Sequence, residues 1–118
     1  MRDGDLTSRD RVEILLDVDR DYSSYYHLVV DHRGHTAESC FGDATWNPQW
    51  FVAAAGDENY WTAEAAIPLK EIGPEAPQVR TVWAVGVQRT VPRVGFQSLT
   101  QPAAITVRPE GFGLLAFE

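Results

Sequence analysis

The stretch "WNPQWFVAAAGDENYWTAEAAIPL", residues 46–69, holds two short segments typical of β-strands, residues 50–55 and 60–67, separated by a polar loop. In the second segment Trp61 alternates with the small or apolar residues Ala63, Ala65 and Ile67. Residues two apart lie on the same face of a strand. The loop is too short for the helical crossover that parallel strands require. The stretch therefore predicts antiparallel strands, with Trp61 on a face that packs into a core.

Five further segments have the same composition, rich in β-branched and aromatic residues and bounded by turn residues: 11–16, 25–31, 36–41, 82–90 and 112–117. Only residues 68–72 favour a helix, of one or two turns, with Pro68 at its start and Gly73 after its end. We predict an all-β fold, an antiparallel β-sandwich of immunoglobulin-like or jelly-roll-like architecture. The expected core residues are Ile14, Leu16, Trp61, Ala65, Ile67, Trp83, Val85 and Leu115.

Length and charge limit the classes of partner. A chain of 118 residues is expected to form one domain, residues 1–118. Its net charge of −7 disfavours nucleic acid and anionic lipid surfaces, because both are polyanions. No apolar run approaches the length of a transmembrane helix. We therefore expect no nucleic acid and no membrane among the partners, and the single cysteine, Cys40, leaves the cellular compartment open.

A cluster of acidic residues is the main candidate for metal binding. Asp17, Asp19 and Asp21 occupy alternate positions of "DVDRD", and calcium binds several carboxylate oxygens that converge from one short loop. The EF-hand pattern is not met, because Tyr22 stands where that loop needs glycine and Leu28 where it needs glutamate. Two interpretations remain: a calcium site of another type, and a solvated acidic turn.

Other carboxylates and histidines give no catalytic pattern. Hydrolysis of a glycosidic bond needs two carboxylates that face one another across a cleft, and Glu13 and Glu64 are candidates. Glu64 is more simply a surface residue that pairs with Arg89 across strands. His32 and His35 flank a turn, and nothing in the sequence supplies the further ligands that a transition metal needs. We find no nucleophile elbow, phosphate loop or zinc-helix motif, and expect no enzyme.

Six segments occur in an order that resembles the family 9 carbohydrate-binding modules and their wider DOMON-like superfamily: "DRVEILLD", "SYYHLVVDHRG", "WNPQWFVAAA", "YWTAEAAIPLKEI", "WAVGVQR" and "PEGFGLLAF". The resemblance covers most of the chain. It implies a non-catalytic carbohydrate-binding module of a larger, exported bacterial protein, with carbohydrate and the other domains of the parent chain as partners. An extracellular or periplasmic location follows from the same resemblance. The alternative is a structural or interaction domain that keeps the sandwich and has lost sugar binding.

The family's sugar site is only partly matched. Its two stacking tryptophans correspond to Thr7 and Thr106, and its strand arginine corresponds to Val29. Glu13 matches a sugar-contacting glutamate of the family. Because aromatic anchors supply much of the affinity of such a site, we expect weak binding, at a surface that includes the loop 97–110. The expected ligand-binding residues are Glu13, Trp46, Gln97 and Gln101.

Members of the family carry further strands before the segment that matches "DRVEILLD", whereas about ten residues precede it in this sequence. The resemblance therefore implies a truncated sandwich with an open sheet edge or an uncovered apolar face. Open edges and exposed apolar faces promote pairing with another chain. We expect self-association through one of them.

Overall fold

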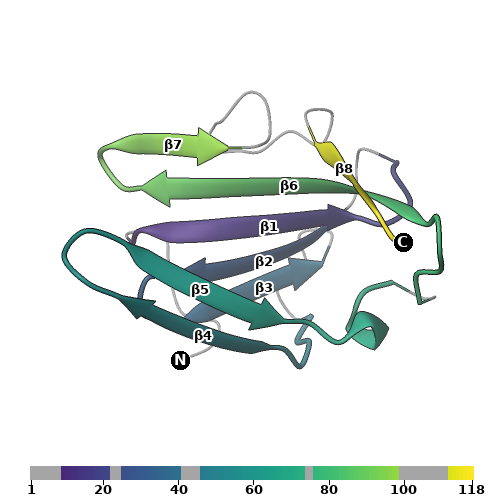
Figure 1. Cartoon of the computed structure of the whole chain (residues 1–118), viewed down its shortest axis with the longest axis horizontal. Helices are drawn as coiled ribbons and strands as arrows, with labels where there is room; N and C mark the ends of the chain where they lie inside the picture. Colours follow the sequence, from purple (N-terminus) through teal and green to yellow (C-terminus); the bar gives the residue numbers. More distant parts are fainter. Residues whose placement is uncertain (1–8, 22–24, 41–45, 74–75, 99–111) are drawn as a thin grey trace.

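Two antiparallel sheets make up the computed structural model, which describes residues 9–21, 25–40, 46–73, 76–98 and 112–118. The main sheet has the strand order β3-β2-β1-β6-β7, and β8 pairs with β6 beside β7 (Figure 1). Its strands are β1 (Arg11–Asp17), β2 (Tyr26–Asp31), β3 (Thr36–Cys40), β6 (Val82–Val91), β7 (Gly95–Ser98) and β8 (Gly113–Ala116). The predicted antiparallel β-sandwich is confirmed.

The small sheet is a hairpin of β4 (Phe51–Gly56) and β5 (Trp61–Ala66), the two strands expected from the opening stretch. The Asp57 carboxylate closes its tip by accepting bonds from the backbone N–H groups of Asn59 and Tyr60, at 2.7 and 3.1 Å. In Figure 1 the hairpin lies across β1, β2 and β3, whereas β6 and β7 extend beyond it. The described strands therefore form two layers over only part of the main sheet.

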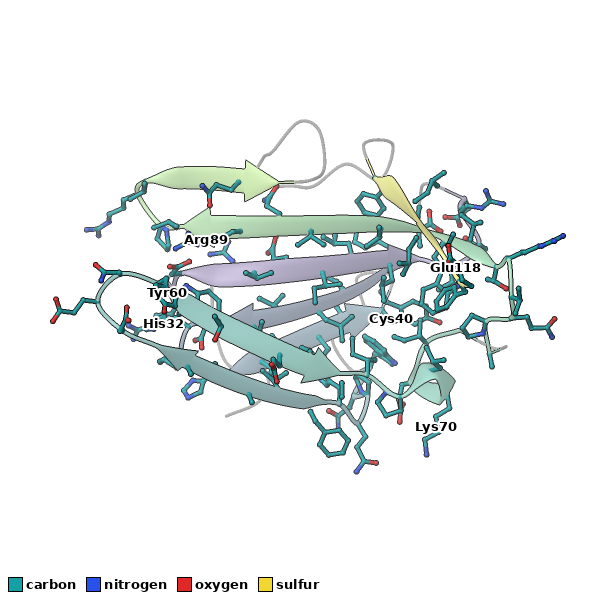
Figure 2. The ribbon with its side chains drawn as sticks, in the orientation of Figure 1. His32, Cys40, Tyr60, Lys70, Arg89 and Glu118 are labelled. Carbon is teal, nitrogen blue, oxygen red and sulfur yellow. The ribbon has the colours of Figure 1, made fainter. Side chains whose placement is uncertain are left out.

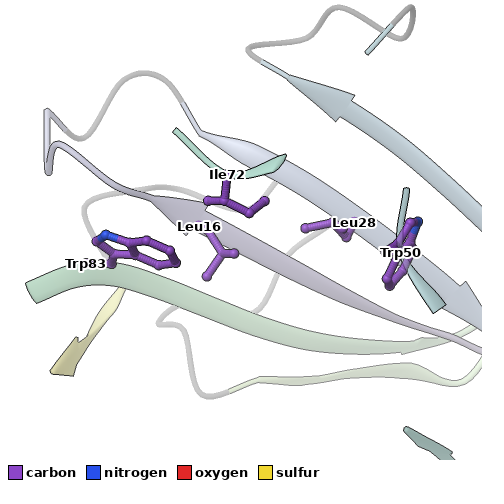
Figure 3. Packing of buried hydrophobic residues seen from close by; sticks show 5 residues of the cluster. All are labelled: Leu16, Leu28, Trp50, Ile72 and Trp83. Atoms are coloured by element: carbon purple, nitrogen blue, oxygen red, sulfur yellow. The ribbon is translucent and has the colours of Figure 1, made fainter. Parts of the chain in front are cut away.

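The core lies between the two layers, toward the end of the molecule that holds the 3₁₀ turn Leu69–Glu71. Five buried side chains form its centre: Leu16, Leu28, Trp50, Ile72 and Trp83 (Figure 3). The Trp50 indole N–H donates to the buried Glu38 carboxylate, so the polar atom of this ring is satisfied inside the core. The predicted burial of Leu16 and Trp83 is confirmed.

The core prediction was wrong for Ala65 and Leu115, both of which are exposed, the latter by 39%. Ile14, Ile67 and Val85 are half-buried and pack against the core. Trp61 is also half-buried, but it does not belong to the core or to the residues that pack against it. The narrow second layer explains why these side chains are less buried than predicted. Alternation along the strands points them between the sheets, as expected. However, the described part of the second sheet consists of β4 and β5 alone, which leaves part of the main sheet uncovered.

The structure also differs from the expected elements at two places. The predicted helix 68–72 is a single 3₁₀ turn, Leu69–Glu71. Gln97, expected in a long loop, lies in β7, a strand that the sequence did not predict; residues 99–110 of that loop lie outside the described residues. Within the described part of the chain, no helix is long and apolar enough to cross a membrane.

Candidate binding face

The outer face of the main sheet, which points away from the β4–β5 hairpin, carries polar residues together with the buried apolar residues Leu15, Val29 and Ala84. Strand register places them there: Glu13 of β1 stands opposite Gln88 of β6, and Arg11 opposite Thr90. Glu13, Gln88 and Thr90 are buried, with exposed fractions of 9, 1 and 7%. Buried polar side chains in the middle of a sheet are uncommon where the sheet serves only to pack a core. This face is therefore the first candidate for recognition of a polar ligand.

Glu13 lies between two basic side chains. Its carboxylate is 3.6 Å from the Arg11 guanidinium and 3.6 Å from His27 Nε2 on β2. Burial raises the pKa of Glu13, but the charge and hydrogen-bonding capacity of His27, helped by Arg11, outweigh it, so the pKa lies below its ordinary value. The carboxylate is thus ionised at neutral pH and available as a hydrogen-bond acceptor.

Aromatic rings continue the row from His27. The Tyr25 ring is 6.5 Å from the His27 ring, and the Phe112 ring is 5.8 Å from Tyr25, both in edge-to-face geometry. Tyr25 precedes β2 and Phe112 precedes β8, so two segments far apart in the sequence bring these half-buried rings together. We call Arg11, Glu13, His27, Tyr25 and Phe112 the outer-face row. It combines charged hydrogen-bonding groups with aromatic surface.

Two buried polar atoms on this face have no hydrogen-bond partner among the described residues: His27 Nε2 and Thr90 Oγ1. An unsatisfied buried donor or acceptor costs about 1–3 kcal/mol. Such groups are commonly completed by water or by a ligand hydroxyl. The face therefore contains two polar atoms without a hydrogen-bond partner among the described residues, and both are buried beneath its surface.

The structure does not bring the sequence-predicted site residues together. Glu13 lies on the outer face, but Trp46 packs on the opposite face against the core, with its ring 5.0 Å from that of Tyr26. Gln97 stands opposite Arg89 in the sheet register, one residue along β6 from Gln88, and so faces away from Glu13. Gln101, Thr7 and Thr106 lie outside the described residues, whereas Val29 is buried directly opposite Glu13.

The sequence-based prediction did not include His27, Tyr25 and Phe112, which this candidate face brings together. They share a face with Glu13 only through the pairing of β2 with β1 and of β8 with β6. One signal was available in the sequence. Alternation along a strand places Tyr25 and His27 on the same face. The register of β1 against β2 then decides whether Glu13 shares that face. The register itself was the missing information.

A second, polar cleft of about 480 Å³ lies at the tip of the β4–β5 hairpin. His32, Tyr60 and Arg89 line it and lie at the same end of the molecule (Figure 2). The Arg89 guanidinium donates two bonds to the Asp10 carboxylate, at 3.0 and 2.7 Å, and the Trp61 indole donates a third at 2.9 Å. The expected pair of Arg89 with Glu64 is therefore wrong, because β5 is not a neighbour of β6 and Asp10 takes the guanidinium.

The three aspartates after β1 do converge. One carboxylate oxygen from each of Asp17, Asp19 and Asp21 lies within 4.8 Å of the others. Within the described residues, these three side chains are therefore close enough to hold one metal ion. The Asp21 backbone N–H lies 3.3 Å from a carboxylate oxygen of Asp17 and 3.2 Å from one of Asp19. Asp17 is buried, whereas the other two are exposed. This donor set is of the oxygen-only kind that suits calcium.

A scan against protein-family models gave no match, and neither did a search of curated proteins. Among solved structures, the chain is similar to a family 9 carbohydrate-binding module from Caldicellulosiruptor kristjanssonii in complex with glucose, with a TM-score of 0.68 and 16% identity over 98% of this chain. A module of that family from the same organism in complex with cellotriose matches with a TM-score of 0.67, 16% identity and 97% coverage. The chain spans 63% and 61% of those two structures, less than two thirds of either. At this identity the likeness concerns the fold, and we conclude that the chain has the β-sandwich fold of a family 9 carbohydrate-binding module.

Proposed function

We propose that the domain is a non-catalytic carbohydrate-binding module that binds sugar weakly on the outer face of its main sheet. The observation that carries this proposal is the outer-face row, which places an ionised carboxylate, an imidazole and two aromatic rings side by side on one face. A pyranose presents hydroxyls around its rim and apolar C–H groups on its faces. The row offers a counterpart to each.

Each residue of the row has a distinct role in this proposal. The Glu13 carboxylate accepts hydrogen bonds from sugar hydroxyls, and the His27 imidazole, 3.6 Å away, orients this carboxylate. Tyr25 and Phe112 supply apolar contact. Their edge-to-face arrangement leaves less open ring surface than two tryptophans on either side of a sugar would. Threonines stand at the two positions where the resemblance implies those tryptophans, so weak affinity is expected.

The test is titration with glucose and cellotriose, the ligands of the two similar structures. We expect Glu13→Gln and Phe112→Ala each to weaken binding at least about fivefold, which corresponds to about 1 kcal/mol. Glu64→Gln is the matched control, because Glu64 is an exposed carboxylate on β5 and remote from the row. Equal affinity of all three variants in folded protein would reject the outer-face row as the site.

We further propose that the turn after β1 holds a structural calcium ion. Three carboxylates held within 4.8 Å repel one another, and a divalent cation would relieve that repulsion. Calcium should then raise the thermal midpoint of the domain, because a ligand that binds only the folded state stabilises it. The rise should vanish in Asp19→Asn and persist in Glu58→Gln, a control that removes an exposed carboxylate elsewhere. No rise with the unsubstituted domain would leave the other interpretation, a solvated acidic turn.

Location and context are part of the same proposal: a module within a larger, exported bacterial protein, outside the cytoplasm. The resemblance of the sequence to family 9 modules supports it. Secretion of a full-length parent protein to the periplasm or the medium would bear it out, and recovery of that protein in the cytoplasm would contradict it.

The second candidate function is a structural or interaction domain without sugar binding. The edge of β5, which pairs with no other strand among the described residues and lies beside exposed apolar residues, favours it. The two functions are compatible, because the outer-face row and the β5 edge lie on different layers of the sandwich.

A further inference from the structure

An apolar trough lies between the two sheets, along the side of β5 that faces away from β4. It has a volume of about 250 Å³, and its apolar lining comprises Val12, Ile14 and Val30 from the main sheet and Trp61, Ala63 and Ala65 from β5. Asn59, Tyr60 and Arg89 also line it. In an ordinary sandwich such side chains are covered by the facing sheet. Here Ala63 and Ala65 are exposed, so the interior of the sandwich is open to solvent along one line.

The backbone of β5 is also unpaired on this side within the described residues, since the small sheet consists of β4 and β5 alone. The hydrogen bond from Asp57 N–H to the Tyr60 carbonyl, 2.9 Å, fixes which residues face which way. Because bonding alternates along an antiparallel pair, the backbone groups of Thr62, Glu64 and Ala66 point to β4. Those of Trp61, Ala63 and Ala65 point to the open edge. The same three residues thus offer backbone bonds and an apolar trough to one occupant.

The main sheet forms the floor under the open edge. In Figure 1, β1 lies next to β5 in the view, and β6 lies beyond β1. A strand added to β5 would therefore lie over β1 and cover Val12 and Ile14, which line the trough.

A second folded copy of the domain fits this edge poorly. Antiparallel pairing of two β5 strands keeps the same face of both hairpins toward the main sheet, so the partner's main sheet would occupy the space already filled by β6 and β7. Parallel pairing about an axis along the strands reverses the faces. It would bury the Glu64 carboxylate, on the outer side of the partner's hairpin, against the apolar trough. This geometry argues against the self-association expected from the sequence, so far as the β5 edge is concerned.

We propose that the open edge of β5 is a docking site for an extended segment of another polypeptide, which adds as a third strand and closes the trough. The edge offers six residues, a length of about 20 Å, so the segment is about six residues long. Its apolar side chains stand at alternate positions, because only one of its faces meets the trough. A basic residue at an end complements the net charge of −7 and the acidic pair Asp57 and Glu58 at the hairpin tip.

The probe is a synthetic eight-residue peptide with blocked ends, in which valine alternates with threonine between two terminal lysines. Its control is a peptide of the same composition with all the valines together and all the threonines together. We expect the alternating peptide to slow hydrogen exchange at the amides of Ala63 and Ala65 and to bind at least tenfold more tightly than the control. Equal binding of both peptides would overturn the proposal, because it would show apolar adhesion without strand pairing.

Two pairs of variants test the edge and the trough separately. Ala63→Pro removes an edge N–H without removing a bond to β4, and should abolish peptide binding. Ala54→Pro does the same at the opposite, β4 edge of the hairpin and should leave binding intact. Ala65→Lys places a charge in the trough and should weaken binding at least tenfold, whereas Ala53→Lys places it on the outer side of the hairpin and should not. Unchanged binding in both Ala63→Pro and Ala65→Lys would overturn the proposal.

The oligomeric state decides between a peptide and a second copy. We expect the unsubstituted domain to sediment as a monomer in the absence of peptide. A dimer that Ala65→Lys converts to monomer would overturn the proposal and make a second copy the occupant of the edge.

Discussion

Asp10 joins parts of the chain that are remote in sequence, because its carboxylate accepts bonds from both Arg89 on β6 and Trp61 on β5. Through this carboxylate the start of β5, next to the hairpin tip, is joined to β6 of the main sheet. The Arg89 guanidinium, ahead of the Trp61 indole, holds the pKa of Asp10 below its ordinary value, against the opposing effect of burial. A depressed pKa means that folding favours the ionised carboxylate.

Asp10→Asn should therefore lower stability at neutral pH and make little difference in acid. The expected loss is about 1 kcal/mol, small because Arg89 is 40% exposed and water screens the pair. The advantage of the carboxylate is complete above the unfolded pKa of about 4 and is lost as the pH falls through the lower folded value. The free energies of unfolding of the two proteins, measured between about pH 7 and pH 2, should converge at the acid end. If the two free energies of unfolding differed by the same amount at every pH, the ionised Asp10 carboxylate would not be the source of the stability.

The β4–β5 hairpin is the element on which both the narrow second layer and the open edge depend. Its last residue before the tip, Gly56, stands opposite Trp61. A Cβ at Gly56 would lie 2.7 Å from the Trp61 Cβ and 3.0 Å from the Tyr60 carbonyl oxygen, closer than packed atoms allow. Glycine is required here by space, since the backbone of this strand residue is not in the left-handed region.

Gly56→Ala should destabilise the domain by about 1–3 kcal/mol, because the hairpin must shift to admit the methyl group. Gly113→Ala is the matched control: this glycine also lies in a strand, and a Cβ there would meet its nearest atom, the Val85 carbonyl oxygen, at an ordinary 3.9 Å. Chemical denaturation of both variants measures the difference. Equal stabilities would show that the hairpin tip is looser than its geometry indicates.

The positions of most strands could be predicted from local sequence patterns. Which strand pairs with or covers which other strand could not. The alternation of Trp61 with small residues identified β5 because period 2 is a property of one strand. That Ala65 and Leu115 are exposed depends on which strand covers which face, and no local pattern carries that information. For the same reason the sequence-based prediction grouped Glu13 with Trp46, although the path of the chain puts the Trp46 ring on the opposite face of the main sheet. β7 was missed because it is a four-residue strand in a segment rich in turn signals.

Over the whole molecule the domain depends on a small core. Trp83 is 5% exposed and packs edge-to-face on Phe117, with ring centroids 4.8 Å apart. Loss of a buried aromatic side chain costs about 3–5 kcal/mol, a large part of the about 5–15 kcal/mol that stabilises a typical domain. Trp83→Ala should therefore be largely unfolded at 37 °C or lose its cooperative thermal transition. Trp46→Ala, which removes a half-buried ring at the border of the core, should keep that transition.

The central claim is that the outer face of the main sheet is the surface that binds sugar. The most direct measurement is a titration of isotope-labelled domain with cellotriose, up to about 10 mM, followed by amide and aromatic chemical shifts; this covers affinities down to about −2.7 kcal/mol. We predict saturable shifts at Glu13, His27, Tyr25 and Phe112, with the amides of β4 and β5 unchanged. Shifts confined to Trp46, Gln97 or the hairpin tip, or no shifts at any concentration, would contradict the account.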